Sequence, residues 1–348
     1  MRGYFYLGIC ALAVMAAIGC NKSKTTAGPG TIVNDVRVSD MAVIMPNPDE
    51  PWSKLQIEYA QMAAKDLGIT LHVVGVNGKT EAALHQATGS ASASRAQGVL
   101  IQSPSEEFGV VIRDEMETFG IPTVAINTRL KDPSTKKYLD TPFHGIDNRD
   151  LGSFAATEAI AEATKRGWKS SETGVIIFSQ LDGGKFAIRG QAMKDTVTAA
   201  GYGPAQVKIL RWSGNADAQS LASAAIGGAF KNWLILGAAD VPTIAGVRAT
   251  ESKSLPASNV IGVSIGGLGT LPELQKQDSG FFGTLLIGPK AQSYDVFTRL
   301  VKAIKASVQV DPLPDYHIGV WITRENLQKE MKEQMLDKLP AYASTIQP

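Results

Sequence analysis

Few residues of this 348-residue chain have the types and spacing that catalysis or metal binding requires. None of its four histidines is paired at the spacing of a metal site: His72, His85, His144 and His317. Both cysteines lie within the first 20 residues, so the rest of the chain offers no thiolate ligand. No G-x-x-x-x-G-K-[ST] phosphate-binding loop occurs. We therefore expect a protein that is not an enzyme and carries no cofactor or metal.

Other residues have side chains suited to holding a small molecule. Indole rings stack on the C–H faces of ligands, and carboxylates, amides and guanidinium groups form hydrogen bonds with polar ligand atoms. Each candidate ends or follows an apolar segment expected to be a buried strand, and open parallel sheets bind ligands beyond the carboxyl ends of their strands. The candidate ligand-binding residues are Glu50, Trp52, Asn127, Arg189, Trp212 and Asp240.

Three of these candidates also have a structural interpretation within a helix. Glu50 could be an acid that favours the dipole at the start of a helix. Trp52 could simply pack after Pro51, because proline is common at the first helical position. Arg189, within a helical pattern, could be a solvated surface charge. For these three residues, both interpretations stay open.

The other three candidates could also serve the fold alone. Asn127 could be a turn former after a buried strand. Asp240 could be the N-cap of a helix that starts at Val241, and for this residue we expect the structural role. Trp212 could fill the interface between two lobes as readily as it could stack on a ligand.

Short apolar runs, each followed by a stretch with helical spacing, predict alternating strands and helices. In the first half, helices are expected over 52–68, 80–94 and 108–120. The expected strands are 41–45, 70–76, 98–102, 121–127, 173–180, 205–212, 232–239 and 259–266. The repetition predicts an α/β protein with two doubly wound parallel-sheet lobes.

The N-terminus has the pattern of an export signal. Arg2 precedes the uncharged apolar run 4–18, which is too short to span a bilayer as a helix. The segment 17–20, AIGC, resembles the lipobox of bacterial lipoproteins, which implies that Cys20 is acylated. We therefore expect a lipoprotein signal peptide over 1–20 and a flexible tether over 21–35, rich in small and polar residues.

Four segments resemble the type I periplasmic solute-binding proteins of ABC importers, and among them the L-arabinose-binding proteins. They are NPDEPWSKLQIEYAQMAAKDLGI at 47–69, NWLILGAADVPTIAGVRATES at 232–252, GFFGTLLIGP at 280–289 and IGVWITRENLQKEM at 318–331. The resemblance implies two lobes joined by three chain crossings that close over a ligand. It places lobe one at 36–145 plus 289–312 and lobe two at 146–288 plus 313–339.

The resemblance also bears on the candidate site. Glu50, Trp52 and Arg189 match the family's glutamate, aromatic wall and arginine. By contrast, several of the family's ligand-binding side chains are replaced, one of them aromatic (at Ser53) and the others polar. The replacements are Pro46, Ser53, Asn127, Thr128, Ala239, Gly266 and Gly269. Since each lost hydrogen bond weakens binding, we infer a ligand different from L-arabinose.

Two interpretations of these replacements remain open. The site could hold a larger or less hydroxylated molecule, such as a monosaccharide or sugar derivative, and this is the interpretation we favour. Alternatively, Arg189 opposite Glu50 could select a non-sugar solute with a carboxylate or an amine.

The expected function is therefore a monomeric receptor in the periplasm or cell envelope. It would be anchored through Cys20 and would deliver its ligand to an ABC permease. A ligand sensor that is not coupled to transport is the alternative. Lys+Arg 34 against Asp+Glu 33 gives a formal net charge of +1, which argues against nucleic acid as a partner.

Overall fold

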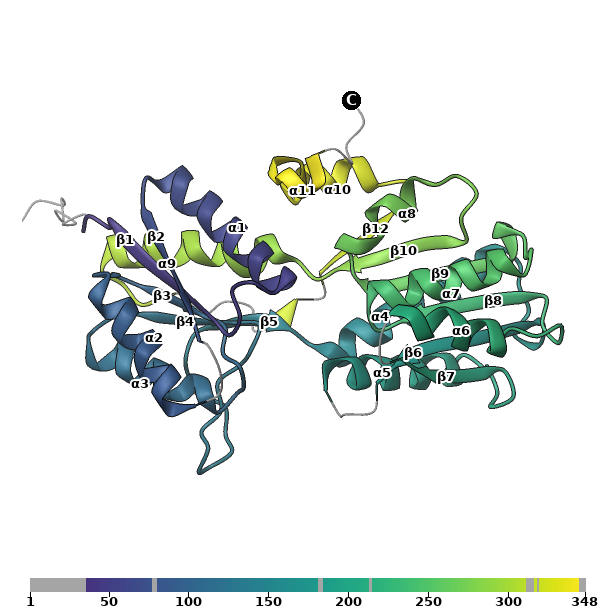
Figure 1. Ribbon diagram of the computed structural model, residues 1–348, viewed down its shortest axis with the longest axis horizontal. Coiled ribbons are helices and arrows are strands. Elements are labelled where there is room, and N and C mark those ends of the chain that lie inside the picture. The colour runs from purple at the N-terminus through teal and green to yellow at the C-terminus, as the bar shows by residue number, and fades with distance from the viewer. Residues whose placement is uncertain are drawn as a thin grey trace, which may run out of the picture. The chain divides into compact units, whose positions relative to one another are not determined.

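The structure, a computed structural model, describes residues 36–76, 80–180, 184–212, 215–310, 316–317 and 319–343. Its strands form two six-stranded sheets, which Figure 1 shows with their helices. The signal peptide, Cys20 and the tether 21–35 lie outside the described residues. Among the described residues, no helix combines the length and the apolar character needed to cross a membrane.

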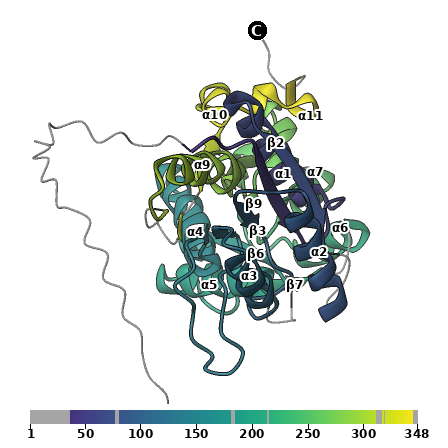
Figure 2. The same cartoon turned by 90° about the vertical axis from the view of Figure 1, so that its left-hand side faces the viewer.

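The first sheet is parallel throughout and has the order β11-β5-β4-β3-β1-β2. Apolar residues on both faces make it a buried sheet. Helices α1 (Pro51–Leu67) and α9 (Val296–Ala306) cover one face, and α2 (Glu81–Ala93) and α3 (Phe108–Thr118) cover the other. Its strands are β1 (Asp40–Met45), β2 (Thr70–Gly75), β3 (Val99–Ile101), β4 (Thr123–Ile126), β5 (Phe143–Ile146) and β11 (Tyr316–His317). Figure 2 shows these elements from the side on which β1 begins.

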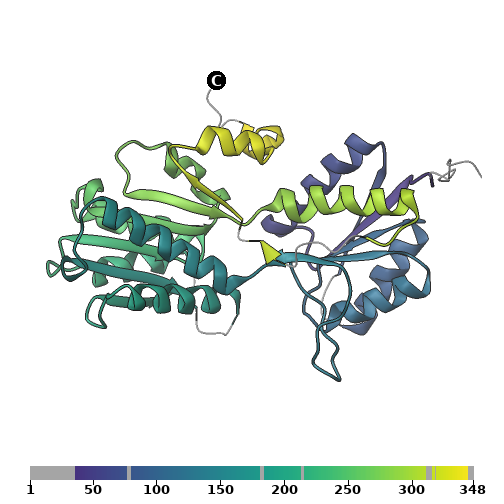
Figure 3. The same cartoon turned by 180° about the vertical axis from the view of Figure 1, so that it is seen from behind.

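The second sheet has the order β12-β10-β9-β8-β6-β7 and is parallel except for β12. Helices α4 (Asn148–Lys165) and α5 (Lys185–Ala199) cover one face, which is nearer the viewer in Figure 3. Helices α6 (Asn215–Ala225), α7 (Asp240–Ser252), α8 (Leu271–Gln275) and α10 (Leu327–Glu333) pack on the other. The strands are β6 (Thr173–Ser179), β7 (Val207–Arg211), β8 (Asn232–Gly237), β9 (Val260–Gly266), β10 (Phe281–Leu286) and β12 (Val320–Thr323).

Shorter elements connect these layers. A π-helical turn, η4 (Lys290–Asp295), follows β10 and leads directly into α9, and α11 (Pro340–Ala343) is the last described helix. The 3-10 turns are η1 (Ser170–Glu172), η2 (Ala257–Asn259), η3 (Leu268–Thr270) and η5 (Leu336–Lys338).

The predicted fold class, with two parallel-dominated sheets, is confirmed. All eight expected strands are present, and each bound lies within two residues of the predicted one, because long apolar runs in buried strands give a strong signal. Strand β10 and the short strands β5, β11 and β12 were not among them. The lobe boundaries stay a prediction. One element differs from the predicted boundaries. Strand β11 pairs with β5 on the first sheet, although the range 313–339 was assigned to lobe two.

Candidate functional site

Each sheet has one position where the strand order reverses, and parallel sheets bind ligands there. In the first sheet this position lies between β1 and β3, where the Gln102 amide donates to the Ile44 carbonyl at 2.9 Å. In the second it lies between β6 and β8, where the Ala238 amide donates to the Phe178 carbonyl at 3.1 Å. Gln102 and Ala238 are therefore equivalent residues of the two sheets, each the first after its strand.

Arg189 lies at the reversal point of the second sheet and is only 3% exposed, so the surface-charge interpretation is wrong. Its Nε donates to Asn148 Oδ1 at 2.9 Å, and its Nη1 donates to the Ala238 carbonyl at 3.0 Å. Burial lowers the pKa of Arg189 to about 10, an effect that the carboxylate of Asp240 opposes. The guanidinium therefore stays charged at neutral pH and is held in a fixed orientation.

Aromatic rings lie beside this guanidinium. The Phe186 ring is 5.6 Å from the Arg189 guanidinium carbon and 5.8 Å from the Trp212 ring. The indole Nε1 of Trp212 is buried and has no hydrogen-bond partner in the part of the chain that the structure describes. Lys185, in the first turn of α5, places its ammonium 5.2 Å from the same Phe186 ring. This end of the second sheet thus combines stacking surface with two cations.

Asp240 has a structural role, but not the one expected. It is the first residue of α7, whose N-cap is Ala239, and it makes no capping hydrogen bond to its own helix. Its Oδ1 accepts from the Ser264 hydroxyl at 2.8 Å and the Gly267 amide at 3.0 Å, and its Oδ2 accepts from the Gly269 amide at 3.0 Å. The carboxylate therefore fixes the loop after β9.

The same arrangement explains why two positions near the start of this loop are glycine. Gly266 has φ +141°, a conformation that residues with a side chain rarely adopt, and a Cβ there would lie 2.9 Å from Asp240 Oδ2. A Cβ at Gly269 would lie 3.3 Å from Asp240 Cβ. Asp240 therefore lies in the space that side chains at these two positions would need.

Glu50 and Trp52 lie where β1 leads into α1, close to the reversal point of the first sheet. Glu50 is the N-cap of α1, and its Oε2 accepts from the Ser53 amide at 3.1 Å, so its structural role is present. Trp52 is partly buried and packs against the apolar clusters on both faces of the second sheet. The charge of Glu50 also interacts with Lys185 of α5. Residues from the two sheets therefore approach one another here.

Asn127 directly follows β4 and has φ +60°, so its role as a turn former is present. Its backbone amide donates to the His144 carbonyl at 3.0 Å, which links the end of β4 to β5. The structure thus brings Glu50, Trp52 and Asn127 to the carboxyl edge of the first sheet, and Arg189, Trp212 and Asp240 to that of the second. Whether they bind a ligand stays a prediction.

Sequence reasoning missed Phe186, Lys185 and Asn148 as neighbours of the site. Phe186 and Lys185 lie between the end of β6 and Arg189, so their position after a predicted strand was a usable signal. Asn148 carried no such signal. It reaches Arg189 only because α4 packs on α5.

Two other features do not form a site. The residues Gly262–Gly266, GVSIG, match the G-x-S-x-G nucleophile pattern, but Ser264 lies within β9, is fully buried and bonds to Asp240 and Thr284. That pattern requires a serine exposed at a strand-to-helix turn. Within the described ranges, no group of three or more His, Cys, Asp or Glu could hold a metal ion.

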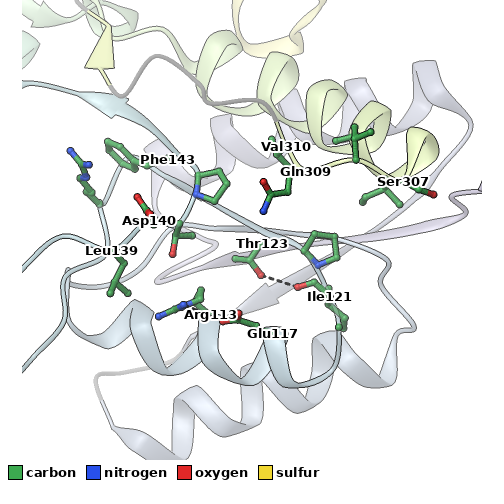
Figure 4. A pocket seen from close by; sticks show the side chains of 18 residues that line it. Arg113, Glu117, Ile121, Thr123, Leu139, Asp140, Phe143, Ser307, Gln309 and Val310 are labelled. Carbon is green, nitrogen blue, oxygen red and sulfur yellow. Dashed lines mark hydrogen bonds and ion pairs between the residues drawn. The ribbon is translucent and has the colours of Figure 1, made fainter.

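A hollow of about 1300 Å³ lies at the opposite edge of the first sheet. Figure 4 shows it between α3, the starts of β4 and β5, and the end of α9. In it, the Thr123 hydroxyl donates to the Ile121 carbonyl at 3.3 Å. Because it lies at the amino ends of the strands, none of the six candidate residues lines it.

Comparisons with known proteins agree with this architecture. The chain is 27% identical over 312 residues to the L-arabinose-binding periplasmic protein of Escherichia coli K12, covering 85% of this chain and 91% of that protein. It is 25% identical over 239 residues to an ABC transporter L-arabinose-binding periplasmic protein of Azospirillum brasilense, covering 67% and 71%.

Solved structures share the fold. The arabinose ABC transporter binding protein from Shewanella sp. ANA-3 has a TM-score of 0.63 at 16% identity, covering 87% of this chain and 98% of that one. The periplasmic ribose ABC transporter protein from Conexibacter woesei has a TM-score of 0.65 at 12% identity, covering 86% and 96%. The sequence model of the periplasmic binding protein domain matches residues 41–307, well over half of the sequence, and the chain therefore belongs to that family.

Proposed function

We propose that this protein captures a monosaccharide or sugar derivative between its two lobes and delivers it to an ABC importer. Its membership of the periplasmic binding protein family and its L-arabinose-binding relatives support this function. Closure follows from differential affinity: a ligand first bound to one lobe gains contacts to the second, which favours the closed state.

The observation that carries the proposal is the arrangement around Arg189. A buried, charged guanidinium is held at the strand-reversal point of the second sheet, with the Phe186 ring beside it and the Trp212 ring against that of Phe186. A sugar needs both kinds of group, because its hydroxyl and ring oxygens accept hydrogen bonds while its C–H faces stack on aromatic rings.

The loop fixed by Asp240 bears on which ligand is bound. Gly266 and Gly269 carry no side chain that could hydrogen-bond a hydroxyl, and the Asp240 oxygens already accept from the loop. This supports a ligand with fewer hydroxyls at this corner than L-arabinose.

A second candidate is a solute with a carboxylate. Lys185 and Arg189 lie one helical turn apart on α5 and flank the same Phe186 ring. Two cations in this position would attract an anionic ligand, such as a sugar acid, through charge-assisted hydrogen bonds.

Calorimetry on residues 21–348 with neutral sugars and the corresponding sugar acids tests the proposal. We expect binding of at least one compound, and we expect Arg189→Lys to weaken it about tenfold because lysine cannot reproduce the guanidinium's planar set of donors. Arg324→Lys is the matched control, since Arg324 also donates to backbone carbonyls, those of Lys276, Ser279 and Phe281, outside the candidate site. Full affinity in Arg189→Lys would remove Arg189 from the site.

Alanine at position 189 would remove the guanidinium altogether. Because Arg189 holds Asn148 and the Ala238 carbonyl, the alanine variant leaves buried groups unpaired and destabilises the fold as well. The lysine substitution is therefore the more informative variant.

A further inference from the structure

Gln102 is a buried residue whose side-chain amide bonds to no described residue. It is 7% exposed, and its Oε1 is buried without a hydrogen-bond partner among the residues that the structure describes. Burying an unpaired amide is unfavourable, and large majorities of such groups in folded proteins are paired. We therefore expect the side-chain amide of Gln102 to form hydrogen bonds with a group outside the described chain.

Neighbouring hydroxyl groups do not provide that partner. Ser103 Oγ donates to the Ser105 carbonyl at 2.6 Å, and Thr128 Oγ1 donates to the Ser103 carbonyl at 3.1 Å. The hydroxyl protons of Ser103 and Thr128 are thus already used.

The position of Gln102 shows where the missing partner would come from. It is the first residue after β3, at the strand-reversal point of the first sheet, and it is equivalent to Ala238 of the second. At Ala238 the protein supplies its own polar partner, since the Arg189 guanidinium donates to the backbone carbonyl of Ala238. At Gln102 the polar group in question is the side-chain amide, and no described residue donates to its oxygen, although this is the edge at which parallel sheets bind ligands.

We propose that Gln102 is a ligand-binding residue whose amide forms hydrogen bonds with a hydroxyl group of the bound sugar. The proposal rests on the proposed function and adds a specificity-determining residue to it. A glutamine amide carries two donors and one acceptor, which matches a hydroxyl that both donates and accepts.

The experiment compares Gln102→Met with Gln292→Met in residues 21–348. Methionine keeps the length of the side chain and removes its polar atoms. Gln292 is the matched control because it is fully buried and bonded at both ends: its Nε2 donates to the Ile287 carbonyl at 2.7 Å, and its Oε1 accepts from Gln56 at 3.1 Å. Thermal unfolding without ligand and calorimetry with L-arabinose, D-galactose, D-ribose, D-allose and myo-inositol are measured for both variants.

Gln102→Met is expected to unfold at or above the wild-type temperature, because no hydrogen bond within the described chain is lost, and to bind the tightest of the five compounds about tenfold more weakly. Gln292→Met is expected to unfold at a lower temperature. Wild-type affinity in Gln102→Met, or a loss of stability equal to that of Gln292→Met, overturns the proposal. If the wild type binds none of the five compounds, the proposed function is wrong for these ligands. The comparison of unfolding temperatures then decides by itself whether Gln102 has a structural role, which would overturn the proposal.

Discussion

The carboxylate of Asp240 shows how a single side chain can hold a loop in place. It binds the backbone of the loop after β9, and the glycines of that loop leave the space in which it lies. The loop is thereby held by the protein itself. The resulting corner presents backbone and glycine to a ligand.

Asp240→Asn is expected to lower the free energy of unfolding by roughly 2 kcal/mol, because a neutral amide with one acceptor oxygen cannot serve three donors, and bonds to charged groups are worth about 1.5–3 kcal/mol. Urea unfolding at pH 7 measures the change. Asp278→Asn is the control, since Asp278 is exposed. Equal stability of the two variants would show that Asp240 does not hold the loop.

At the scale of the element, helix α1 carries both structure and candidate chemistry. Glu50 caps its start, Pro51 is its first residue, and Gly68 ends it at φ +68°. Ile57, Ala60 and Ala64 pack on the first sheet. The start of the helix, and with it Trp52, is therefore held at the edge where β1 ends.

Glu50→Ala and Glu50→Gln separate the two roles of this residue. The alanine variant loses the cap and is expected to lower the free energy of unfolding by about 1 kcal/mol, whereas glutamine keeps an oxygen that accepts from Ser53 and is expected to retain most of the stability. If Glu50 also contacts ligand, both variants bind more weakly. Asp49→Ala, which removes a highly exposed carboxylate next to the same helix end, is the control. Chemical denaturation and calorimetry distinguish these outcomes, and equal destabilisation by both Glu50 variants would contradict the capping role.

The elements differ in how well sequence predicts them. Strands β6 and β8 are continuous apolar runs buried on both faces, so their pattern is strong. Strands β5 and β12 have four residues each, and β11 has two, which is too short for a periodic signal. They pair because neighbouring strands already present open edges.

At the scale of the whole molecule, the C-terminal residues join elements far apart in the sequence. Arg324, just after β12, donates to the carbonyls of Ser279 and Phe281 beside β10. Ten residues further on, the Gln334 carbonyl accepts from the hydroxyl of Tyr59 of α1, at 2.5 Å. The C-terminal segment thus contacts α1 as well as the second sheet, and it buries Tyr59 completely.

The proposed attachment to the membrane also belongs to this scale. Acylation of Cys20 would retain the protein at the membrane, because several acyl chains together give stable anchoring. We expect the wild type to partition into the detergent phase of a Triton X-114 extract and Cys20→Ser to move to the aqueous phase. Cys10→Ser, within the apolar run, is the control and is expected to behave as the wild type. An aqueous wild type would exclude the anchor.

The sequence by itself determined the layers of this protein and the edges at which its polar residues gather. Buried strands and amphipathic helices are local patterns, so eight strands and the doubly wound fold could be predicted, and residues placed after strands necessarily lie at the carboxyl edges. The partners of those residues could not be predicted in this way. Arg189 is buried against Asn148 and Ala238, and Asp240 holds the backbone of a loop 27 to 29 residues further on. The side-chain oxygen of Gln102 has no hydrogen-bond partner in the described chain. These features depend on contacts between distant segments. Only the packing of helices on sheets decides such contacts, because hydrogen bonding depends on distances in space that no local pattern of residues records.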